Sequence, residues 1–378
     1  MSRLVQFGNA VAREVGPTLS QLAPQSVLLV TGARSFELSK AAAALEGALS
    51  VQRLARFSTP EPFPTLSHIS QGIGVFREEG CDTIVAVGGG KVMDTAKLIG
   101  IFGVQHVGAA DIVLRGVPIE DHGPRLIAVP TTAGSGSECT HFAAVYVRGR
   151  KYSVAHDSLL PSHAFVDPQL TYSVPPKVTA ATGLDALCHA IESFWSVNST
   201  EQSRAYASEA IPLVVRNLPA AVHRPTPEAR RAMSLAAHLA GKAINISKTT
   251  AAHALSYTMT SHFGVAHGHA TALTLGEFLV HNSETTTDTL ADSRGLPHLR
   301  QAIDDVCELL GCPDAYTARD KLAGLIASLG LADRLTQLGI RTASQRRFLA
   351  ESANLERLGN NPRTISEEAI RDILERVA

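Results

Sequence analysis

The chain has 378 residues, a length that suits two domains of ordinary size. Hydrophobic residues make up 45% of it and charged residues 18%, so a largely disordered chain is excluded. The 34 Lys and Arg residues nearly balance the 35 Asp and Glu residues, and the formal net charge is -1. We therefore expect no nucleic-acid partner and no attachment to an anionic membrane.

The sequence also lacks signals for export or membrane insertion. Residues 1–15 include charged side chains and no apolar stretch of the kind that a signal peptide needs. No uncharged apolar run is long enough for a membrane-spanning helix. The five cysteines include no CxxC pair and do not resemble a disulfide framework. We expect a soluble protein of the reducing cytoplasm.

Short β-branched apolar segments in the first half predict the strands of a parallel sheet. They cover residues 26–31, 83–87 and 126–129, each is followed by glycine or proline, and segments with helical periodicity lie between them. Buried strands that alternate with helices in this way are typical of α/β domains. We expect residues 1–175 to form a dinucleotide-binding α/β domain.

Two loops that follow predicted strands are rich in small and polar residues. The sequence VGGGKVMDTAK at 87–97 places three glycines between a strand and a helix, where backbone N–H groups can approach a pyrophosphate. The sequence AVPTTAGSGSE at 128–138 adds hydroxyl groups that suit phosphate, ribose or nicotinamide binding at a sheet edge. A tight turn and a capped helix are the plain alternatives, but two such loops together favour a nucleotide site.

Beyond residue 175 the pattern becomes helical. Adjacent prolines at 175 and 176 mark the boundary, because neither a strand nor a helix continues through them. Ala- and Leu-rich segments predict helices at Val178–Ser196, Glu201–Asn217, Pro227–Ala243, Lys248–Phe263, His298–Leu310 and Glu367–Val377. We expect residues 176–378 to form an all-α domain.

Four polar side chains among apolar neighbours in this half indicate a metal site. Asp185 and His189 lie four residues apart, hence on one face of a helix, where a buried carboxylate and imidazole need a partner or a metal. A simple Asp–His hydrogen bond in the core explains that pair equally well. His253 and His267 complete a donor set that suits Fe²⁺ or Zn²⁺ with a vacant position for a substrate oxygen.

Taken in order, these motifs resemble the iron-dependent (group III) alcohol dehydrogenase family. The resemblance rests on GGGKVMDTAK at 88–97, PTTAGSGSE at 130–138, VDPQLTYSVPP at 166–176, GLDALCHAIE at 183–192, AHALSYTMTSHFGVAHG at 252–268 and NNPRTISEEAI at 360–370. It implies a fold similar to that of dehydroquinate synthase: a dinucleotide-binding α/β domain, an all-α metal-binding domain, and an active site between them. We also expect a homodimer or a larger homo-oligomer.

Carried over position by position, the resemblance assigns roles to individual residues. The implied metal ligands are Asp185, His189, His253 and His267, and the aspartate argues against the related maleylacetate reductases, which commonly lack it. The dinucleotide contacts fall on Gly32, Gly89, Gly90, Lys91, Asp94, Thr131, Thr132, Ser135 and Lys151. Two of these depart from the family pattern: Gly32 replaces an acidic residue that holds the ribose, and Lys91 replaces a serine.

The implied reaction is the metal-dependent reduction of a small aldehyde to a primary alcohol by NADH or NADPH. Glycine at position 32 takes the place of a carboxylate that would repel the 2′-phosphate of NADP, and the positive charge of Arg34 would attract that phosphate. We therefore expect the protein to accept NADP. The proton donor is open between ordered water and a side chain, for which His141, Tyr257 and His269 are the candidates. Tyr257 stands where the family often has a further histidine.

The sequence also resembles the phosphonoacetaldehyde reductase branch, whose product is 2-hydroxyethylphosphonate. The similar segments are AAHALSYTM at 251–259, TGARSF at 31–36 and Lys248. A desolvated phosphonate needs a fixed cation, for which we expect Lys248, with His141 and His262 as further donors. The alternatives are an ordinary short-chain alcohol dehydrogenase, a lyase-cyclase similar to dehydroquinate synthase, and a non-catalytic metal-binding protein.

Overall fold

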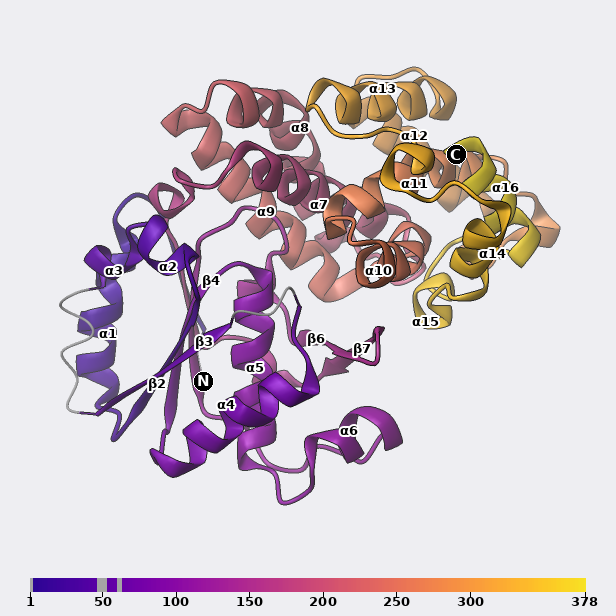
Figure 1. Cartoon of the computed structure of the whole chain (residues 1–378). Coiled ribbons are helices and arrows are strands. Elements are labelled where there is room, and N and C mark those ends of the chain that lie inside the picture. Colours follow the sequence, from indigo (N-terminus) through magenta and orange to yellow (C-terminus); the bar gives the residue numbers. More distant parts are fainter. Residues whose placement is uncertain (1–2, 46–52, 60–62) are drawn as a thin grey trace. The chain divides into compact units, whose positions relative to one another are not determined.

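The computed structural model describes residues 3–45, 53–59 and 63–378, which divide into two compact units, Met1–Val174 and Pro175–Ala378. The N-terminal unit is built on a parallel sheet with helices, and the C-terminal unit is helical (Figure 1). This confirms the expected combination of an α/β and an all-α part.

The sheet of the N-terminal unit has six strands, all parallel. From edge to edge they are β1 (Leu4–Phe7), β8 (His163–Val166), β5 (Arg125–Pro130), β4 (Thr83–Gly88), β2 (Val27–Gly32) and β3 (Leu54–Thr59). The three predicted strands are confirmed as β2, β4 and β5. Their residues are almost wholly buried, as expected where helices cover both faces of a sheet.

The alternation of side chains along these strands supplies two cores. Helices α4 (Leu66–Glu78) and α5 (Gly90–Val104) cover one face, and α1 (Val15–Leu22), α2 (Ser35–Leu38) and α3 (Ala41–Ala44) cover the other. In β2, Leu28 and Val30 point into the first core, whereas Val27 and Leu29 point into the second. Packing on both sides therefore fixes the carboxyl ends of β4 and β5, from which the two polar loops emerge.

A hairpin and a short helix complete this unit. Strands β6 (Phe142–Val147) and β7 (Arg150–Ala155) pair antiparallel, and their turn residues Arg148 and Gly149 both have positive φ, as a two-residue hairpin turn requires. Helix α6 (Ala109–Arg115) contacts β7.

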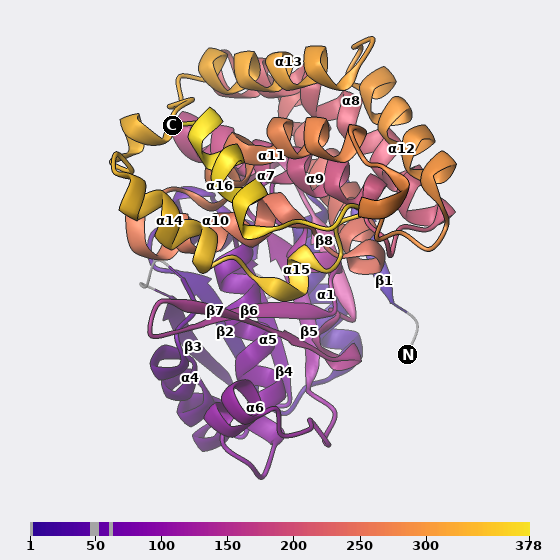
Figure 2. The same ribbon diagram turned by 90° about the vertical axis from the view of Figure 1, so that its right-hand side faces the viewer.

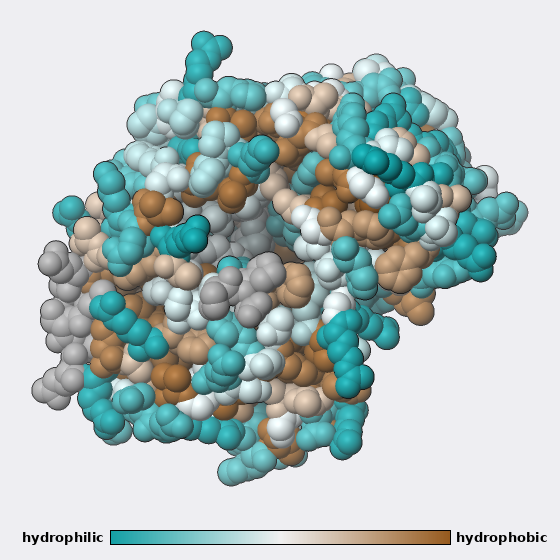
Figure 3. All heavy atoms as spheres, in the orientation of Figure 1, coloured by the Kyte–Doolittle hydropathy of each residue, from teal (hydrophilic) through white to brown (hydrophobic). Residues whose placement is uncertain are grey.

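No single helix in the described ranges is both long and apolar enough to cross a membrane, and α5 and α6 reach that length only as a pair bent by 108°. The face shown in Figure 3 has hydrophilic residues interspersed with apolar patches. This mixture agrees with a mean hydropathy of +0.07.

The C-terminal unit consists of helices and the segments that connect them (Figure 2). They are α7 (Pro176–Trp195), α8 (Glu201–His223), α9 (Pro227–Ser247), α10 (Ala251–Phe263), α11 (His267–Ser283), α12 (Leu296–Leu309), α13 (Ala315–Ser328), α14 (Ala343–Glu351), α15 (Leu355–Leu358) and α16 (Glu367–Arg376). Helix α7 is buried along most of its length and packs against α8, α9 and α11. Gly183 lets α8 approach closely, since a Cβ atom there would lie 2.3 Å from Cδ1 of Leu218.

All six predicted helices are present, with three corrections. Helix α8 continues to His223, past the predicted end at Asn217, and α9 continues to Ser247, past the predicted end at Ala243. Helix α10 begins at Ala251 and not at Lys248, because Lys248 ends α9 with a φ of 60°, outside the right-handed helical region. Helices α11 and α13 to α15 were not predicted.

Candidate functional site

Helix α7 carries the first two predicted metal ligands. Asp185 and His189 are one helical turn apart on the same face, and both side chains are buried. Oδ1 of Asp185 lies 3.8 Å from Nε2 of His189. That distance exceeds hydrogen-bond length, so the simple Asp–His bond considered above is not made between these two atoms.

Helices α10 and α11 bring the other two predicted ligands to the same carboxylate oxygen. Nε2 of His253, in the first turn of α10, lies 3.6 Å from Oδ1 of Asp185. Nε2 of His267, the first residue of α11, lies 3.8 Å from it. One carboxylate oxygen is thus surrounded by three imidazole nitrogens, all supplied by the helical unit.

This arrangement fits a metal ion. Four donors held about 2.1 Å from a tetrahedral metal lie about 3.4 Å apart, slightly closer than the distances found here. Oδ1 of Asp185 and Nε2 of His253 are buried and have no hydrogen-bond partner among the described residues. Burial by itself would raise the pKa of the Asp185 carboxyl, but the neighbouring imidazoles outweigh burial and hold that pKa below its usual range. A cation would satisfy both buried atoms.

The three histidine side chains of the cluster differ in exposure, so the cluster is more accessible on one side than on the others. The side chain of His267 is 29% exposed, whereas those of His189 and His253 are 7% and 2% exposed. A ligand would therefore reach the cluster beside His267.

Glu192, which the sequence analysis did not single out, holds His253. Its carboxylate accepts hydrogen bonds from Nδ1 of His253 and from the hydroxyl of Thr250, and also from two backbone N–H groups at the start of α10. Burial lowers the pKa of His253, but the Glu192 carboxylate more than compensates and raises it to about 9. Glu192 follows Asp185 by seven residues on the same helix face, so the spacing could have indicated it.

Two further side chains lie next to this cluster. The ring of Tyr257 stacks near that of His267, with centroids 5.8 Å apart and an angle of 26° between the ring planes. Nε of Arg357 donates to the hydroxyl of Tyr257 at 3.4 Å. The sequence analysis did not single out Arg357.

Lys248, which the sequence analysis expected to bind the anion, has a half-exposed side chain. Its Nζ lies 4.0 Å from Oε1 of Glu356.

The other histidines considered as donors have separate surroundings. Nε2 of His269 donates to the carbonyl of Ala332 at 2.6 Å, and burial lowers the pKa of its imidazole. His262 is exposed and packs edge-on against Phe348. His141 belongs to the N-terminal unit, just before β6, and packs edge-on against Phe142.

The two polar loops of the N-terminal unit touch each other at the end of the sheet. A Cβ atom on Gly89 would lie 3.0 Å from Oγ1 of Thr132, and one on Gly90 would lie 2.6 Å from Oγ of Ser135. The N–H of Thr131 donates to the carbonyl of Gly88 at 3.0 Å. The Thr131 hydroxyl is buried and has no hydrogen-bond partner within the described part of the chain. Glycine is therefore needed where the two loops meet, beside the N-terminus of α5.

Asp94 ties α5 to the segment that follows the second of these loops. Its carboxylate accepts hydrogen bonds from the hydroxyl of Ser137 at 2.8 Å and from the N–H of Ala144 at 3.0 Å. The residue is buried, and burial raises the pKa of its carboxyl. Since both oxygens are bonded to protein, the structure favours a positioning role for Asp94 over direct contact with a nucleotide.

Lys97, one turn further along α5, was not predicted. Its ammonium donates to the hydroxyls of Ser137 and Thr140 and to the carbonyls of Thr140 and Phe142, at 2.9 to 3.0 Å. It is 2% exposed, and burial lowers its pKa to about 8. Together with Asp94 it ties α5 to the whole segment from Ser137 to Ala144.

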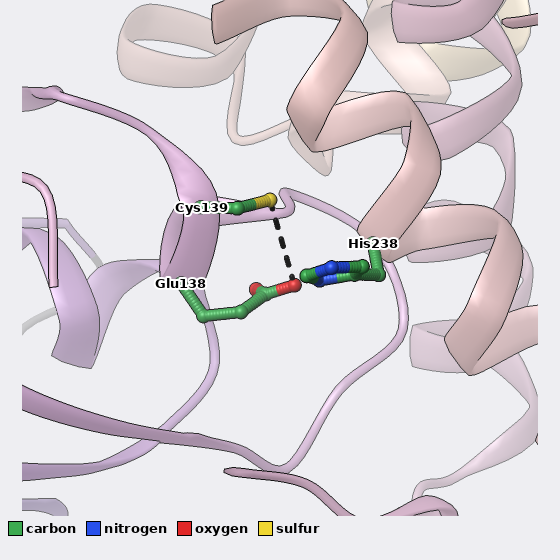
Figure 4. A group of neighbouring side chains, drawn as sticks. All are labelled: Glu138, Cys139 and His238. Atoms are coloured by element: carbon green, nitrogen blue, oxygen red, sulfur yellow. Dashed lines mark hydrogen bonds between the residues drawn. The ribbon is translucent and has the colours of Figure 1, made fainter. Parts of the chain in front are cut away.

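The same segment includes a short helical turn, Ser137–Cys139, shown in Figure 4. The Cys139 thiol donates to Oε1 of Glu138 at 3.8 Å, and both residues are buried. The turn completes the loop between β5 and β6.

The remaining predicted nucleotide-binding residues lie around the same unit. Gly32 is the last residue of β2, where a Cβ atom would meet Oγ of Ser35 at 2.2 Å. Lys91 lies in the first turn of α5. Lys151 lies on β7, paired with Tyr146.

Comparisons with known proteins agree over both units. Residues 2–168 match the profile of iron-containing alcohol dehydrogenase, and residues 179–378 match that of the C-terminal domain of the Fe-containing alcohol dehydrogenase family. Long-chain-alcohol dehydrogenase 1 of Geobacillus thermodenitrificans is 34% identical over 319 residues, which cover 83% of this chain and 79% of that protein. Phosphonoacetaldehyde reductase of Streptomyces viridochromogenes is 34% identical over 302 residues, which cover 78% and 75%.

Solved structures show the same fold. Sulfoacetaldehyde reductase from Bifidobacterium kashiwanohense, in complex with NAD+, has a TM-score of 0.88 at 29% identity, and the match covers 100% of this chain and 97% of that one. An iron-containing alcohol dehydrogenase from Thermotoga maritima has a TM-score of 0.84 at 28% identity, with 100% and 98% covered.

Proposed function

Because the chain belongs to the iron-containing alcohol dehydrogenase family, we propose that this oxidoreductase reduces a small aldehyde to a primary alcohol. The observation that carries the proposal is the buried group of Asp185, His189 and His253, with Nε2 of the partly exposed His267 3.8 Å from the same carboxylate oxygen of Asp185. Bound Fe²⁺ or Zn²⁺ would supply Lewis-acid chemistry there, and a nicotinamide nucleotide would supply hydride.

The residues of the helical unit prepare the site for that chemistry. Glu192 holds the His253 ring by its Nδ1 and so directs Nε2 toward Asp185. His267 keeps one side of the cluster accessible, which leaves room for the carbonyl group. Tyr257, stacked beside His267, holds its proton at the phenol oxygen with Arg357 as partner, and we propose this phenol as the proton donor.

The N-terminal unit would bind the nucleotide. Backbone N–H groups at Gly89 and Gly90 and at the start of α5 suit the pyrophosphate. Thr131, Thr132 and Ser135 belong to the second loop, which touches these glycines. We propose that NAD and NADP are both accepted, because Gly32 places no carboxylate at the end of β2 and the exposed Arg34 lies two residues further. The NAD+ complex of the similar sulfoacetaldehyde reductase supports a nicotinamide dinucleotide in general.

We propose phosphonoacetaldehyde as the first substrate to examine. A phosphonoacetaldehyde reductase and a sulfoacetaldehyde reductase are among the similar proteins, and both names describe a two-carbon aldehyde with an anionic group. The similarity to a long-chain-alcohol dehydrogenase supports uncharged aldehydes as the alternative substrates, so an uncharged aldehyde is tested beside the anionic ones.

The direct test measures nicotinamide oxidation. The purified protein is stripped of metal, reloaded with Fe²⁺ or Zn²⁺, and mixed with NADH or NADPH and either phosphonoacetaldehyde, sulfoacetaldehyde or propanal. We expect metal-dependent loss of nicotinamide absorbance, and His267→Ala should lower both metal retention and rate. The proposal is wrong if no aldehyde oxidises the cofactor, or if the metal-stripped His267→Ala protein is fully active.

A further inference from the structure

The N-terminus of helix α10 is capped by a side chain from another helix. Thr250 is the N-cap residue of α10, but within the described helix its side chain accepts no hydrogen bond from the first turn. Oε1 of Glu192, on α7, instead accepts from the N–H groups of Ala252 and His253, at 2.9 and 3.2 Å. The positive end of the helix dipole favours a carboxylate at this position. Glu192 therefore holds the backbone of His253 as well as its ring.

The hydroxyl of Thr250 is directed at the same carboxylate. It donates to Oε1 of Glu192 at 2.9 Å, and its oxygen accepts from the indole N–H of Trp195 at 3.0 Å. An indole nitrogen can only donate, so Thr250 must be the acceptor in that bond, and its single proton remains for Glu192. The three residues are at most 1% exposed, so bulk solvent does not compete for these bonds. The direction of the hydroxyl is thus set by Trp195.

The short segment between α9 and α10, which ends in this threonine, is fixed by hydrogen bonds. Oγ of Ser196, at the end of α7, donates to the carbonyl of Ser247 at 2.7 Å. Nδ2 of Asn360 donates to the carbonyl of Thr249 at 2.9 Å. Between these two carbonyls, Lys248 has a φ of 60° and a ψ of 177°, a conformation that residues with a Cβ atom rarely adopt. Such a conformation persists only where the surroundings impose it, so the threonine that follows is held in place beside α7.

Together these bonds engage both oxygens of the Glu192 carboxylate. Oε1 accepts from Thr250 and from the two N–H groups at the start of α10, and Oε2 accepts from Nδ1 of His253. Because the carboxylate is buried, loss of any of these hydrogen bonds leaves it less well compensated. Without the bond from Thr250 the carboxylate is held less tightly, and so is the imidazole ring that it orients.

We propose that Thr250 is a positioning residue of the metal site. Its hydroxyl, oriented by Trp195, holds the Glu192 carboxylate, which in turn directs the metal ligand His253. This inference rests on the proposed function and adds two residues outside the donor set. Groups that orient a metal ligand contribute to metal affinity as well as to geometry. The hydroxyl is the part of Thr250 that acts here, so serine should replace it, whereas valine, which has the same shape but no donor, should not.

The test measures the affinity for Co²⁺, which serves as a visible probe of the metal site. The wild type, Thr250→Val, Thr250→Ser and the control Thr274→Val are loaded with Co²⁺ and dialysed against graded concentrations of a chelator. Thr274 is also buried in the helical unit, and its hydroxyl donates to the carbonyl of Thr271 within its own helix at 3.5 Å. We expect Thr250→Val to bind Co²⁺ about 5- to 20-fold more weakly, and Thr250→Ser and Thr274→Val to stay within about 2-fold of the wild type.

The visible absorption of bound Co²⁺ gives an independent readout, because it depends on the geometry of the ligands. At saturating Co²⁺, Thr250→Val should change the positions or intensities of the bands, whereas a purely structural role would lower the free energy of unfolding and leave the spectrum as in the wild type. Trp195→Phe keeps an aromatic ring but removes the indole N–H, so it should change the spectrum in the same direction. If Thr250→Val does not fold, Thr250→Ala and Trp195→Phe are measured in its place.

Three results would overturn the inference: a Thr250→Val protein with the Co²⁺ affinity or the spectrum of the wild type, a loss in Thr250→Ser as large as that in Thr250→Val, or an equal loss in Thr274→Val. A wild type that binds Co²⁺ but reduces no aldehyde rejects the proposed reaction, and the affinities of the variants still decide this inference. A wild type that binds no divalent metal rejects both.

Discussion

The imidazole of His253 donates from Nδ1 to Oε2 of Glu192, and its other nitrogen, Nε2, lies 3.6 Å from Oδ1 of Asp185. The pKa of the Glu192 carboxyl lies below its usual range, because the adjacent His253 imidazole and the hydrogen bonds from α10 outweigh the effect of burial. An ionised carboxylate only accepts hydrogen bonds, so the proton belongs to Nδ1 of His253. The raised pKa of His253 keeps a proton on Nε2 as well, and loss of that proton on metal binding would direct the Nε2 lone pair at the centre of the cluster.

Replacing Glu192 by Gln should therefore weaken metal binding. The amide is a poorer acceptor for the Nδ1 proton, and it removes a negative charge near the cation. We expect metal affinity to fall about 10- to 100-fold, measured as the metal retained after dialysis against graded chelator concentrations. Glu209→Gln, on the exposed face of α8, serves as the control and should retain metal as the wild type does. Equal retention in both variants would contradict the role given to Glu192.

Local spacing predicted the part of this site that one helix supplies. Asp185 and His189 share a face of α7 because four residues make about one turn, and the same period extends to Glu192. The start of α11 at His267 was not predicted, since Gly268 and the polar residues that follow it give a weak helical pattern. His267 itself was still singled out as a metal ligand, because it lies among small and apolar residues, as His253 does.

Long-range pairing explains what the sequence could not predict. Arg357 and Tyr257 are separated by 100 residues, and Lys97 meets partners more than 40 residues away, so no local pattern connects them. In the sheet, the predicted strands β2, β4 and β5 are buried, whereas β1 and β3 at the edges include exposed residues and lack a continuous apolar run. The inner strand β8 was missed as well, and it has only four residues.

Gly268 provides a second prediction, because it fixes the distance between α11 and α7. A Cβ atom there would lie 2.1 Å from the carbonyl oxygen of Ala181 and 2.7 Å from the backbone N of Asp185. These are backbone atoms, so Gly268→Ala must push the start of α11 away from α7 and take His267 with it. We expect the free energy of unfolding to fall by about 1–3 kcal/mol, with weaker metal retention.

Gly324→Ala is the matched control for that variant. Gly324 lies inside α13, and a Cβ atom there meets nothing within 4 Å. Alanine should raise the free energy of unfolding by about 0.5–1 kcal/mol through its better helix propensity. Denaturant unfolding measures the free energy of unfolding of both variants. A Gly268→Ala protein as stable as the wild type would show that α11 and α7 are not closely packed at this position.

A third prediction concerns pH and Lys97. Burial lowers the pKa of its ammonium in the folded protein from 10.5 to about 8, so between these values the unfolded chain binds more protons than the folded one. The free energy of unfolding therefore rises with pH in this interval, by up to about 3 kcal/mol from this group. Other groups titrate in the same range, so the quantity to measure is the difference in stability between the wild type and Lys97→Met.

We expect that difference to shift in favour of the wild type as the pH is raised from about 7.5 to about 10. Urea unfolding at a series of pH values, with constant ionic strength, measures it. A difference that stays constant across the series, or that moves in favour of Lys97→Met, would mean that the folded protein does not lower the pKa of Lys97.

The last prediction concerns the nucleotide and Gly32. A carboxylate at the end of β2 would accept hydrogen bonds from the ribose hydroxyls of NAD and would repel the 2′-phosphate of NADP. A Cβ atom added to Gly32 would meet Oγ of Ser35 at 2.2 Å, but the next neighbours, Cβ of Ser35 and Cγ2 of Val92, are 3.5 and 3.6 Å away. Rotation of the Ser35 hydroxyl is thus enough to admit a side chain.

Gly32→Asp should raise the ratio of kcat/KM for NAD to that for NADP by about tenfold or more. Gly32→Ala requires the same rotation without adding charge, so it should leave the ratio near the wild-type value while revealing any steric cost common to both nucleotides. An unchanged ratio in Gly32→Asp, or an equal change in Gly32→Ala, would show that the end of β2 does not face the ribose.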